Sequence, residues 1–188
     1  MLTDNIRQRL VAELDDDQRE VRNRAALELG KAADPRTAEP LVARLWREED
    51  FFVRETLTWA VVRLAEDATP HLLTGLAHPS WLARFQAAHA LSKLGRFEHA
   101  AALIPLIADR DDRVAARAYW AAAKTGNPSV LPALVAQLGR GDAEHRTALG
   151  DAFAVLGAAA VPPLTEALAS ADARVREHAA DVLGELGH

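Results

Sequence analysis

Apolar residues recur along the chain with the spacing of amphipathic helices, and one helical phrase returns six times. The phrase starts at Val21, Val53, Ala83, Val114, His145 and Val175, at intervals of 30 to 32 residues. A second phrase with its own apolar stripe precedes each of them. Apolar residues three and four positions apart lie on one side of a helix. The chain is therefore predicted to be all-α, with six two-helix repeats and about twelve helices.

The six repeats leave no linker between them. Their boundaries are predicted at residues 1–34, 35–66, 67–95, 96–126, 127–157 and 158–188, which are called repeats 1 to 6 below. In repeat proteins the apolar side of each repeat is covered by its neighbour. We therefore expect a single repeat domain over residues 1–188.

Residues typical of helix ends separate the phrases. An Asp or Ser side chain that accepts a hydrogen bond from the first helical N–H groups favours a helix start. Such residues precede the second phrases at Asp17, Asp50, Ser80, Asp111, Asp142 and Asp172. Glycines that suit a left-handed helix ending follow at Gly95, Gly126, Gly157 and Gly187. Glycines inside the phrases predict a close approach of neighbouring helices at Gly30, Gly150 and Gly184.

The repeated phrases resemble HEAT repeats, and more narrowly the short bacterial kind known from phycobilin-lyase-like proteins. Val-Arg starts, Ala-Ala pairs and Leu-Gly ends carry the resemblance, as in Val21-Arg22 and Ala179-Ala180. The resemblance covers all 188 residues. It implies a right-handed α-solenoid whose second helices line the concave side. This class includes scaffolds, lyase subunits, a metal hydroxylase and DNA glycosylases, so it does not assign a function by itself.

The composition supports a helical fold and excludes several kinds of site. There are 40 Ala and 26 Leu against 13 Val and 3 Ile, which favours helix over sheet. The absence of Cys excludes disulfides and thiolate-bound metals. No phosphate-binding loop, GxSxG, HExxH or EF-hand pattern occurs. The three Glu-His dipeptides run in the opposite order to the His-Glu pairs of the metal hydroxylase relatives. No metal, cofactor or catalytic residue is predicted.

The charge balance disfavours nucleic acid and membranes as partners. The chain has 22 Lys and Arg and 27 Asp and Glu, a formal net charge of −5. This balance is too acidic to hold a phosphate backbone by bulk charge. No run of 18 apolar residues occurs, and the polar segment 3–9 is unlike a secretory signal. We expect a cytoplasmic protein.

One face of the second helices carries residues that suit binding. When each helix is numbered from the start of its phrase, positions 3, 7 and 11 share a face. The HEAT resemblance places that face in the concave groove. In repeats 2 to 4 the candidate binding residues are Glu55, Trp59, Arg63, Phe85, His89, Lys93, Trp120 and Lys124. Two interpretations of Trp59 and Trp120 stay open: an exposed binding patch, or packing over a small residue of the neighbouring helix.

Arginine usually occupies the second position of the phrase, and these side chains are interpreted as structural. We expect a ladder between repeats in which they pair with loop carboxylates such as Asp16, Glu48 and Asp109. Repeat 4 departs from the pattern because it has Ala115 at this position. The ladder residues are Arg22, Arg54, Arg84, Arg146 and Arg176.

The leading hypothesis is a non-enzymatic scaffold or adaptor that binds a protein or peptide through its concave face. That face is aromatic and basic in repeats 2 to 4, so its cations would suit an acidic partner. One alternative is a HEAT-like DNA-repair glycosylase acting on an extruded base, with Trp59, Trp120 and Glu55 as the groove residues. The acidic C-terminal third argues against a continuous phosphate track. A phycobilin-lyase-like subunit is the other alternative.

Overall fold

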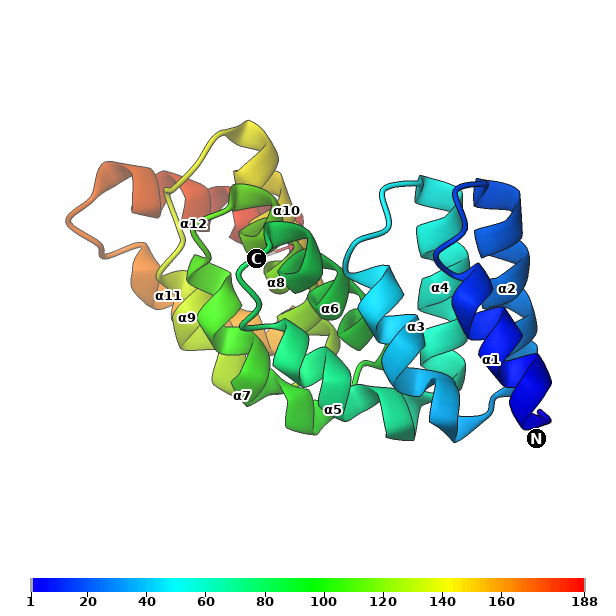
Figure 1. Ribbon diagram of the computed structural model, residues 1–188. Helices are drawn as coiled ribbons and strands as arrows, with labels where there is room; N and C mark the ends of the chain where they lie inside the picture. The colour runs from blue at the N-terminus through cyan, green and yellow to red at the C-terminus, as the bar shows by residue number, and fades with distance from the viewer. Residues whose placement is uncertain (1, 188) are drawn as a thin grey trace. The chain divides into compact units, whose positions relative to one another are not determined.

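The computed structural model describes residues 2–187 and contains twelve α-helices, five 3-10 helices and no strand in that range (Figure 1). The all-α class and the α-solenoid of two-helix repeats are confirmed. The chain forms two compact units, Met1–Leu94 and Gly95–His188. They are called the N-terminal and C-terminal units below, and each contains three of the six repeats. The single domain over residues 1–188 stays a prediction.

The N-terminal unit is built from two layers of helices. The second helices α2, α4 and α6 pack side by side, and the first helices α3 and α5 pack against each other (Figure 1). Leucines such as Leu29, Leu41 and Leu57 are fully buried between the layers. Burial of one such side chain contributes about 1.5–3 kcal/mol. The elements are α1 (Asp4–Glu13), α2 (Arg19–Ala32), η1 (Pro35–Thr37), α3 (Ala38–Leu45), α4 (Phe51–Arg63), α5 (Ala65–Gly75) and α6 (Trp81–Leu94).

The C-terminal unit repeats this plan with shorter first helices. Its second helices α8 and α10 pack together, as do α10 and α12. Pro105 removes a backbone donor, so α7 ends at Leu103 and continues as a 3-10 turn. The elements are η2 (Phe97–His99), α7 (Ala100–Leu103), η3 (Ile104–Ala108), α8 (Asp112–Lys124), η4 (Pro128–Val130), α9 (Leu131–Val135), α10 (Ala143–Leu156), η5 (Gly157–Ala160), α11 (Val161–Ala167) and α12 (Ala173–Glu185).

The predicted helix ends are largely confirmed. The carboxylates of Asp50, Asp111, Asp142 and Asp172 each accept a hydrogen bond from a backbone N–H in the first turn of the helix that follows. Asp17 is wrong as the start of α2, because Gln18 precedes the helix without a side-chain bond. The four predicted C-terminal glycines have the positive φ that favours glycine, between 56° and 81°: Gly95, Gly126, Gly157 and Gly187.

Repeat 1 closes its second helix without a glycine. Ala33 adopts the left-handed conformation, with φ and ψ both 45°. A Cβ in this conformation costs roughly 1–2 kcal/mol. We expect Ala33→Gly to raise the free energy of unfolding in urea by about 1 kcal/mol. Ala32→Gly, one residue earlier inside α2, is the matched control and should lower it by about 1 kcal/mol. A loss of stability in both variants would contradict the assignment of strain to Ala33.

One stretch, residues 143–167, has the length and the apolar composition of a membrane span. It comprises α10, η5 and α11, so it is two α-helices separated by a 3-10 turn that begins at Gly157, where φ is positive. Both helices pack within the C-terminal unit, α10 against α8 and α12, and α11 against α9 and α12. The stretch therefore contributes two core helices to the repeat fold.

His178 connects the last two repeats through its imidazole ring. It is 5 % exposed, and its Nδ1 accepts a hydrogen bond from the Gly139 N–H at 3.2 Å. The Nε2 atom lies 3.2 Å from the Arg146 carbonyl oxygen, so it carries the proton and donates to it. Burial lowers the pKa of His178 below its ordinary value. The neutral ring is therefore part of the packing of α12.

Candidate interaction surface

The candidate binding residues of repeats 2 and 3 lie on the neighbouring helices α4 and α6. The side chains of Glu55 on α4 and His89 on α6 meet, with Oε1 and Nε2 3.7 Å apart. Phe85 is half-buried, and its ring meets the Trp81 ring edge-on with centroids 6.4 Å apart. Arg63 and Lys93 are exposed. The name α4–α6 surface is used below for Glu55, Trp59, Arg63, Phe85, His89 and Lys93.

Trp59 combines the two interpretations that the sequence left open. The side chain packs over Gly30 of α2, where an added Cβ would collide with the indole ring. The residue is nevertheless 41 % exposed. The Arg63 guanidinium carbon lies 5.8 Å from the Trp59 ring centroid, within the range of a cation–π interaction. Packing on one side therefore holds an exposed aromatic surface in place.

The contact with Gly30 leads to a prediction for the packing of α2 on α4. A Cβ at Gly30 would also lie 2.8 Å from the Cβ of Ala60, and neither helix can yield there without moving backbone. We expect Gly30→Ala to cost about 1–3 kcal/mol of the free energy of unfolding. Chemical denaturation followed by circular dichroism measures this cost.

Gly184 provides a matched control because it occupies the same position of the phrase on α12. A Cβ there would meet nothing within 4 Å, so the close approach predicted for Gly184 is wrong. Gly184→Ala should instead stabilise the chain by up to about 1 kcal/mol, the helix propensity difference. Equal effects of the two substitutions would contradict the packing role of Gly30. At Gly150 a Cβ would make ordinary contacts with Val182 and Glu185.

Trp120 and Lys124 show the same arrangement on α8, within the C-terminal unit. Trp120 is 38 % exposed, and the Lys124 ammonium lies 5.8 Å from its ring centroid. In both units an aromatic residue at position 7 is therefore covered partly by a cation four residues later. This spacing places the two side chains on one face of the helix.

Four arginines at the second position share one geometry. Each donates from Nη1 to the two backbone carbonyls six and five residues earlier, in the loop of its own repeat. The Arg84 donor reaches the His78 and Pro79 oxygens at 2.9 and 3.0 Å. The same bonds link Arg22 to residues 16 and 17, Arg54 to residues 48 and 49, and Arg176 to residues 170 and 171.

The carboxylates expected as ladder partners have other contacts as well. Those of Asp16 and Asp109 accept hydrogen bonds from the backbone N–H two residues later, which shapes the loop. Arg146 is exposed, and the structure records no bond to loop carbonyls for it. Its loop differs because Gly139 and Gly141 are both left-handed.

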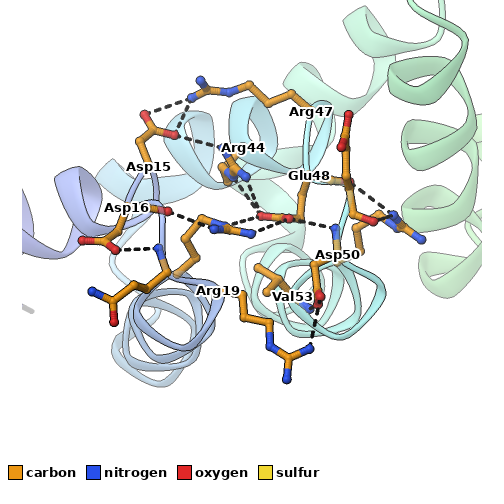
Figure 2. A network of polar contacts seen from close by, with 12 residues as sticks. Asp15, Asp16, Arg19, Arg44, Arg47, Glu48, Asp50 and Val53 are labelled. Atoms are coloured by element: carbon orange, nitrogen blue, oxygen red, sulfur yellow. Dashed lines mark hydrogen bonds and ion pairs between the residues drawn. The ribbon is translucent and has the colours of Figure 1, made fainter.

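Glu48 is the acceptor at the centre of a buried ion-pair network (Figure 2). It is 1 % exposed and accepts both Arg22 Nε at 2.8 Å and Arg44 Nη2 at 2.6 Å. The second carboxylate oxygen accepts the Asp50 N–H at 2.9 Å. Burial raises the pKa of Glu48, but the hydrogen bonds from Arg22, Asp50 and Arg44 outweigh it and lower the pKa to about 2. Glu48 therefore joins repeat 1 to repeat 2.

A pocket in the N-terminal unit was not predicted from the sequence. Its volume is about 510 Å³, and it lies where the loops before α4 and α6 come together. Trp81 is 37 % exposed there, and Trp46 packs on Gly75 and His78. The candidate binding residues predicted from the sequence did not include Trp46 and Trp81, although their shared place at helix ends beside loops was a usable signal. The lining residues are Trp46, Arg47, Glu49, Arg54, Ser80, Trp81 and Leu82.

One further observation concerns metal binding, and a second concerns exposed aromatic residues. Among residues 2–187 no group of three or more His, Asp or Glu side chains is placed to hold a metal ion. Phe51, Phe52 and Phe97 are 58 %, 69 % and 59 % exposed, and sequence reasoning did not single them out. Phe52 stands on α4, seven residues before Trp59, and extends the aromatic content of that helix.

Comparisons with known proteins identify the repeats. Residues 69–154 match the family of HEAT repeats. No curated protein sequence matches the chain. The complex of CpcE and CpcF of phycocyanin lyase from Nostoc sp. PCC7120 is 24 % identical, covers 100 % of this chain and 78 % of its own, and has a TM-score of 0.58.

Two other solved structures share the fold. A designed armadillo repeat protein in complex with the peptide (KR)4 is 19 % identical, with coverage of 96 % and 99 % and a TM-score of 0.52. Human deoxyhypusine hydroxylase in complex with glycerol is 21 % identical, with coverage of 97 % and 74 % and a TM-score of 0.50. The fold thus serves a binding protein as well as enzymes. Residues 69–154 therefore match the HEAT-repeat family, and the paired helices extend an α-solenoid fold over residues 2–187.

Proposed function

We propose that the chain is a non-enzymatic scaffold or adaptor that binds a protein or peptide partner through the face of its second helices. One observation carries the proposal: exposed indole rings stand beside cations on that face in both units. Trp59 with Arg63 and Trp120 with Lys124 are the two pairs. The other side chains of the α4–α6 surface would make further contacts with the partner.

The packing of Trp59 favours binding because the ring is already ordered. Its contact with Gly30 restricts the side chain before a partner arrives, so little conformational entropy is lost on association. Large aromatic residues with this property dominate the energetics of interfaces. The exposed part of the ring gains hydrophobic free energy when a partner covers it.

The charges on this face favour a partner that contributes carboxylates. Arg63, Lys93 and Lys124 are exposed, and each stands at position 11 of its helix. Complementary charges raise the association rate and fix the orientation of the partner. The designed armadillo repeat protein that binds (KR)4 supports peptide binding by this fold. That peptide is basic, so we propose the opposite charge preference here.

Selection from a peptide library tests the proposal. Wild-type protein is used as bait, and the enriched peptides are measured by calorimetry against Trp59→Ala and Arg63→Ala. We expect acidic peptides with at least one apolar residue, and at least about tenfold weaker binding to each variant. Phe97→Ala, which removes an exposed aromatic residue elsewhere, is the control and should leave affinity unchanged.

The binding measurements need a parallel test of folding. Trp59→Ala should cost about 2 kcal/mol of stability, because the ring is only partly buried, so affinities are compared where circular dichroism shows both proteins folded. Failure to enrich any peptide, or equal losses in Phe97→Ala, would contradict the proposal. Duplex DNA binding that weakens steeply with salt would contradict it as well and would favour the glycosylase alternative.

A further inference from the structure

The guanidinium of Arg22 has two sets of partners. Its Nη1 donates to the loop carbonyls of residues 16 and 17 in its own repeat. Its Nε and Nη2 donate to the two carboxylate oxygens of Glu48, at 2.8 and 3.0 Å. This is the bidentate geometry in which arginine binds a carboxylate most strongly. The loop of repeat 2 thus supplies the carboxylate that fills the fork of the arginine in repeat 1.

The loop of repeat 3 lacks the carboxylates that the loop of repeat 2 carries. His78 and Ser80 stand three residues and one residue before α6, the places that Glu48 and Asp50 hold before α4. The His78 Nδ1 accepts the Ser80 N–H at 3.1 Å, as the Glu48 carboxylate accepts the Asp50 N–H. The His78 ring lies against Trp46, with centroids 5.2 Å apart. His78 therefore shapes the loop as Glu48 does but brings no carboxylate to the preceding arginine.

Arg54 is the arginine of repeat 2 that this loop leaves without an ion pair. Its Nη1 donates to the carbonyls of residues 48 and 49, as the Arg22 Nη1 does in repeat 1. The guanidinium carbon lies 6.0 Å from the Phe51 ring centroid. Within residues 2–187 the structure records no hydrogen bond from the Nε or Nη2 of Arg54 and no carboxylate paired with it. Two parallel N–H donors on a half-buried cation therefore remain for another acceptor.

The pocket of about 510 Å³ described above lies at this place. Arg54 lines it from one side, and Ser80, Trp81 and Leu82 line it from the beginning of α6. Its volume falls within the roughly 300–1,000 Å³ that is common for ligand pockets. Trp46 and Trp81 contribute indole rings to the lining, so an apolar group can pack beside a charged one.

The other charged residues of the lining differ in their pairing. The Arg47 Nη2 lies 2.9 Å from the Asp15 carboxylate, which neutralises this cation locally. Glu49 is exposed, and no ion pair is recorded for it in the described part of the chain. Arg54 is therefore the cation that can take up a new carboxylate, and Glu49 opposes it.

We propose that this pocket binds an aspartate or glutamate side chain of a partner protein, whose carboxylate pairs with the Nε and Nη2 of Arg54 as Glu48 pairs with Arg22. An apolar residue beside it in the partner would pack on Trp46 and Trp81. The positive N-terminal end of α6 also favours an anion here. The pocket shares no residue with the α4–α6 surface, and the proposal does not rest on the function proposed above.

A titration with the capped dipeptide acetyl-Glu-Phe-amide tests the proposal. The chain has four tryptophans, and their indole N–H signals in NMR spectra, assigned with single Trp→Phe variants, report on separate places. We expect saturable shifts of the Trp46 and Trp81 signals, with those of Trp59 and Trp120 unchanged. Acetyl-Gln-Phe-amide has the same shape without the charge and should bind at least about tenfold more weakly. Acetyl-Ala-Phe, whose carboxylate is the C-terminus, should also bind more weakly.

A matched pair of variants at His78 distinguishes binding from packing. His78→Glu places a carboxylate of the chain itself where Glu48 stands in the preceding loop, so it should abolish binding of the probe. His78→Gln has the same length without the charge and should change the affinity by less than about twofold. Circular dichroism checks that both variants are folded.

Two further variants test the charges. Arg54→Lys keeps the positive charge without the planar fork and should weaken binding several-fold. Glu49→Gln removes the opposing charge and should strengthen it. No saturable shift, shifts centred on Trp59, equal binding of the Gln dipeptide, or undiminished binding to His78→Glu would overturn the proposal. Tighter binding of acetyl-Ala-Phe than of acetyl-Glu-Phe-amide would overturn the assignment to a side-chain carboxylate.

Discussion

Replacing Glu48 with alanine will lower the free energy of unfolding by about 3–5 kcal/mol, the usual result of removing one partner of a buried ion pair. The carboxylate is 1 % exposed and accepts two arginines and a backbone N–H. Without it, Arg22 and Arg44 keep their charges in a region from which water is largely excluded. Arg22 would retain its carbonyl partners at residues 16 and 17, which limits the damage to the contact between repeats.

Two neighbouring substitutions make this measurement specific. Glu48→Gln keeps the shape and an acceptor but removes the negative charge, so we expect a smaller loss. Glu49→Ala removes an exposed carboxylate one residue away and should change stability by less than about 0.5 kcal/mol. Urea denaturation of the three variants gives the comparison. A loss at Glu48→Ala no larger than that at Glu49→Ala would show that the network contributes no net stability.

Acidification will destabilise the two units in different pH ranges. The folded pKa of Glu48 is about 2 against an ordinary value of 4.5. Its contribution is therefore complete above about pH 4.5 and is lost as the pH falls towards 2. The loss amounts to about 3 kcal/mol. Asp34 acts in the same direction, because the hydrogen bond from Arg36 lowers its pKa although burial opposes the shift.

The C-terminal unit should respond at higher pH. His178 has a pKa lowered from 6.5, mainly by burial, so its stabilising effect is present above pH 6.5 and declines as the pH falls below it. Tryptophan fluorescence follows mainly the N-terminal unit, which holds Trp46, Trp59 and Trp81. The NMR signals of the Tyr119 ring report on the C-terminal unit, because Tyr119 is the only tyrosine in the sequence. Unfolding of the N-terminal unit at the higher pH would contradict this prediction, and Glu48→Gln should weaken its acid response.

The helices could be predicted because their signals are local. The apolar period and the capping residues act within one or two turns, so Asp50 and Asp142 begin helices as the sequence indicates. The left-handed conformation of Ala33 could not be predicted, because alanine gives no local sequence signal for it. Gly184 has the sequence of a packing glycine, but a Cβ there would meet nothing within 4 Å, and this depends on the neighbouring structure rather than on the local sequence.

The candidate surface was predicted in part because position 7 of a helix specifies its face. The exposed fractions of Trp59 and Trp120 could not be predicted, since they depend on the neighbouring helix. The pairing of Arg22 with Glu48 agrees with the expected ladder. The additional arginine bonds to backbone carbonyls could not be predicted, because every residue has a carbonyl and the residue type does not indicate which one accepts a bond. The pocket lined by Trp81 forms where two loops of different repeats come together. The spacing of residues within one repeat does not reveal this contact, so the pocket could not be predicted.

The bonds between arginine and loop carbonyls also bear on the order of folding. Each bond spans five or six residues of the chain, so closing it costs little loop entropy. The Arg22–Glu48 pair spans 26 residues and joins two repeats, so it can form only after both hairpins exist. Contacts at short sequence separation favour rapid folding. In the four repeats that have these bonds we therefore expect the turn of the hairpin to be fixed before neighbouring hairpins stack, which leaves stacking as the slower step.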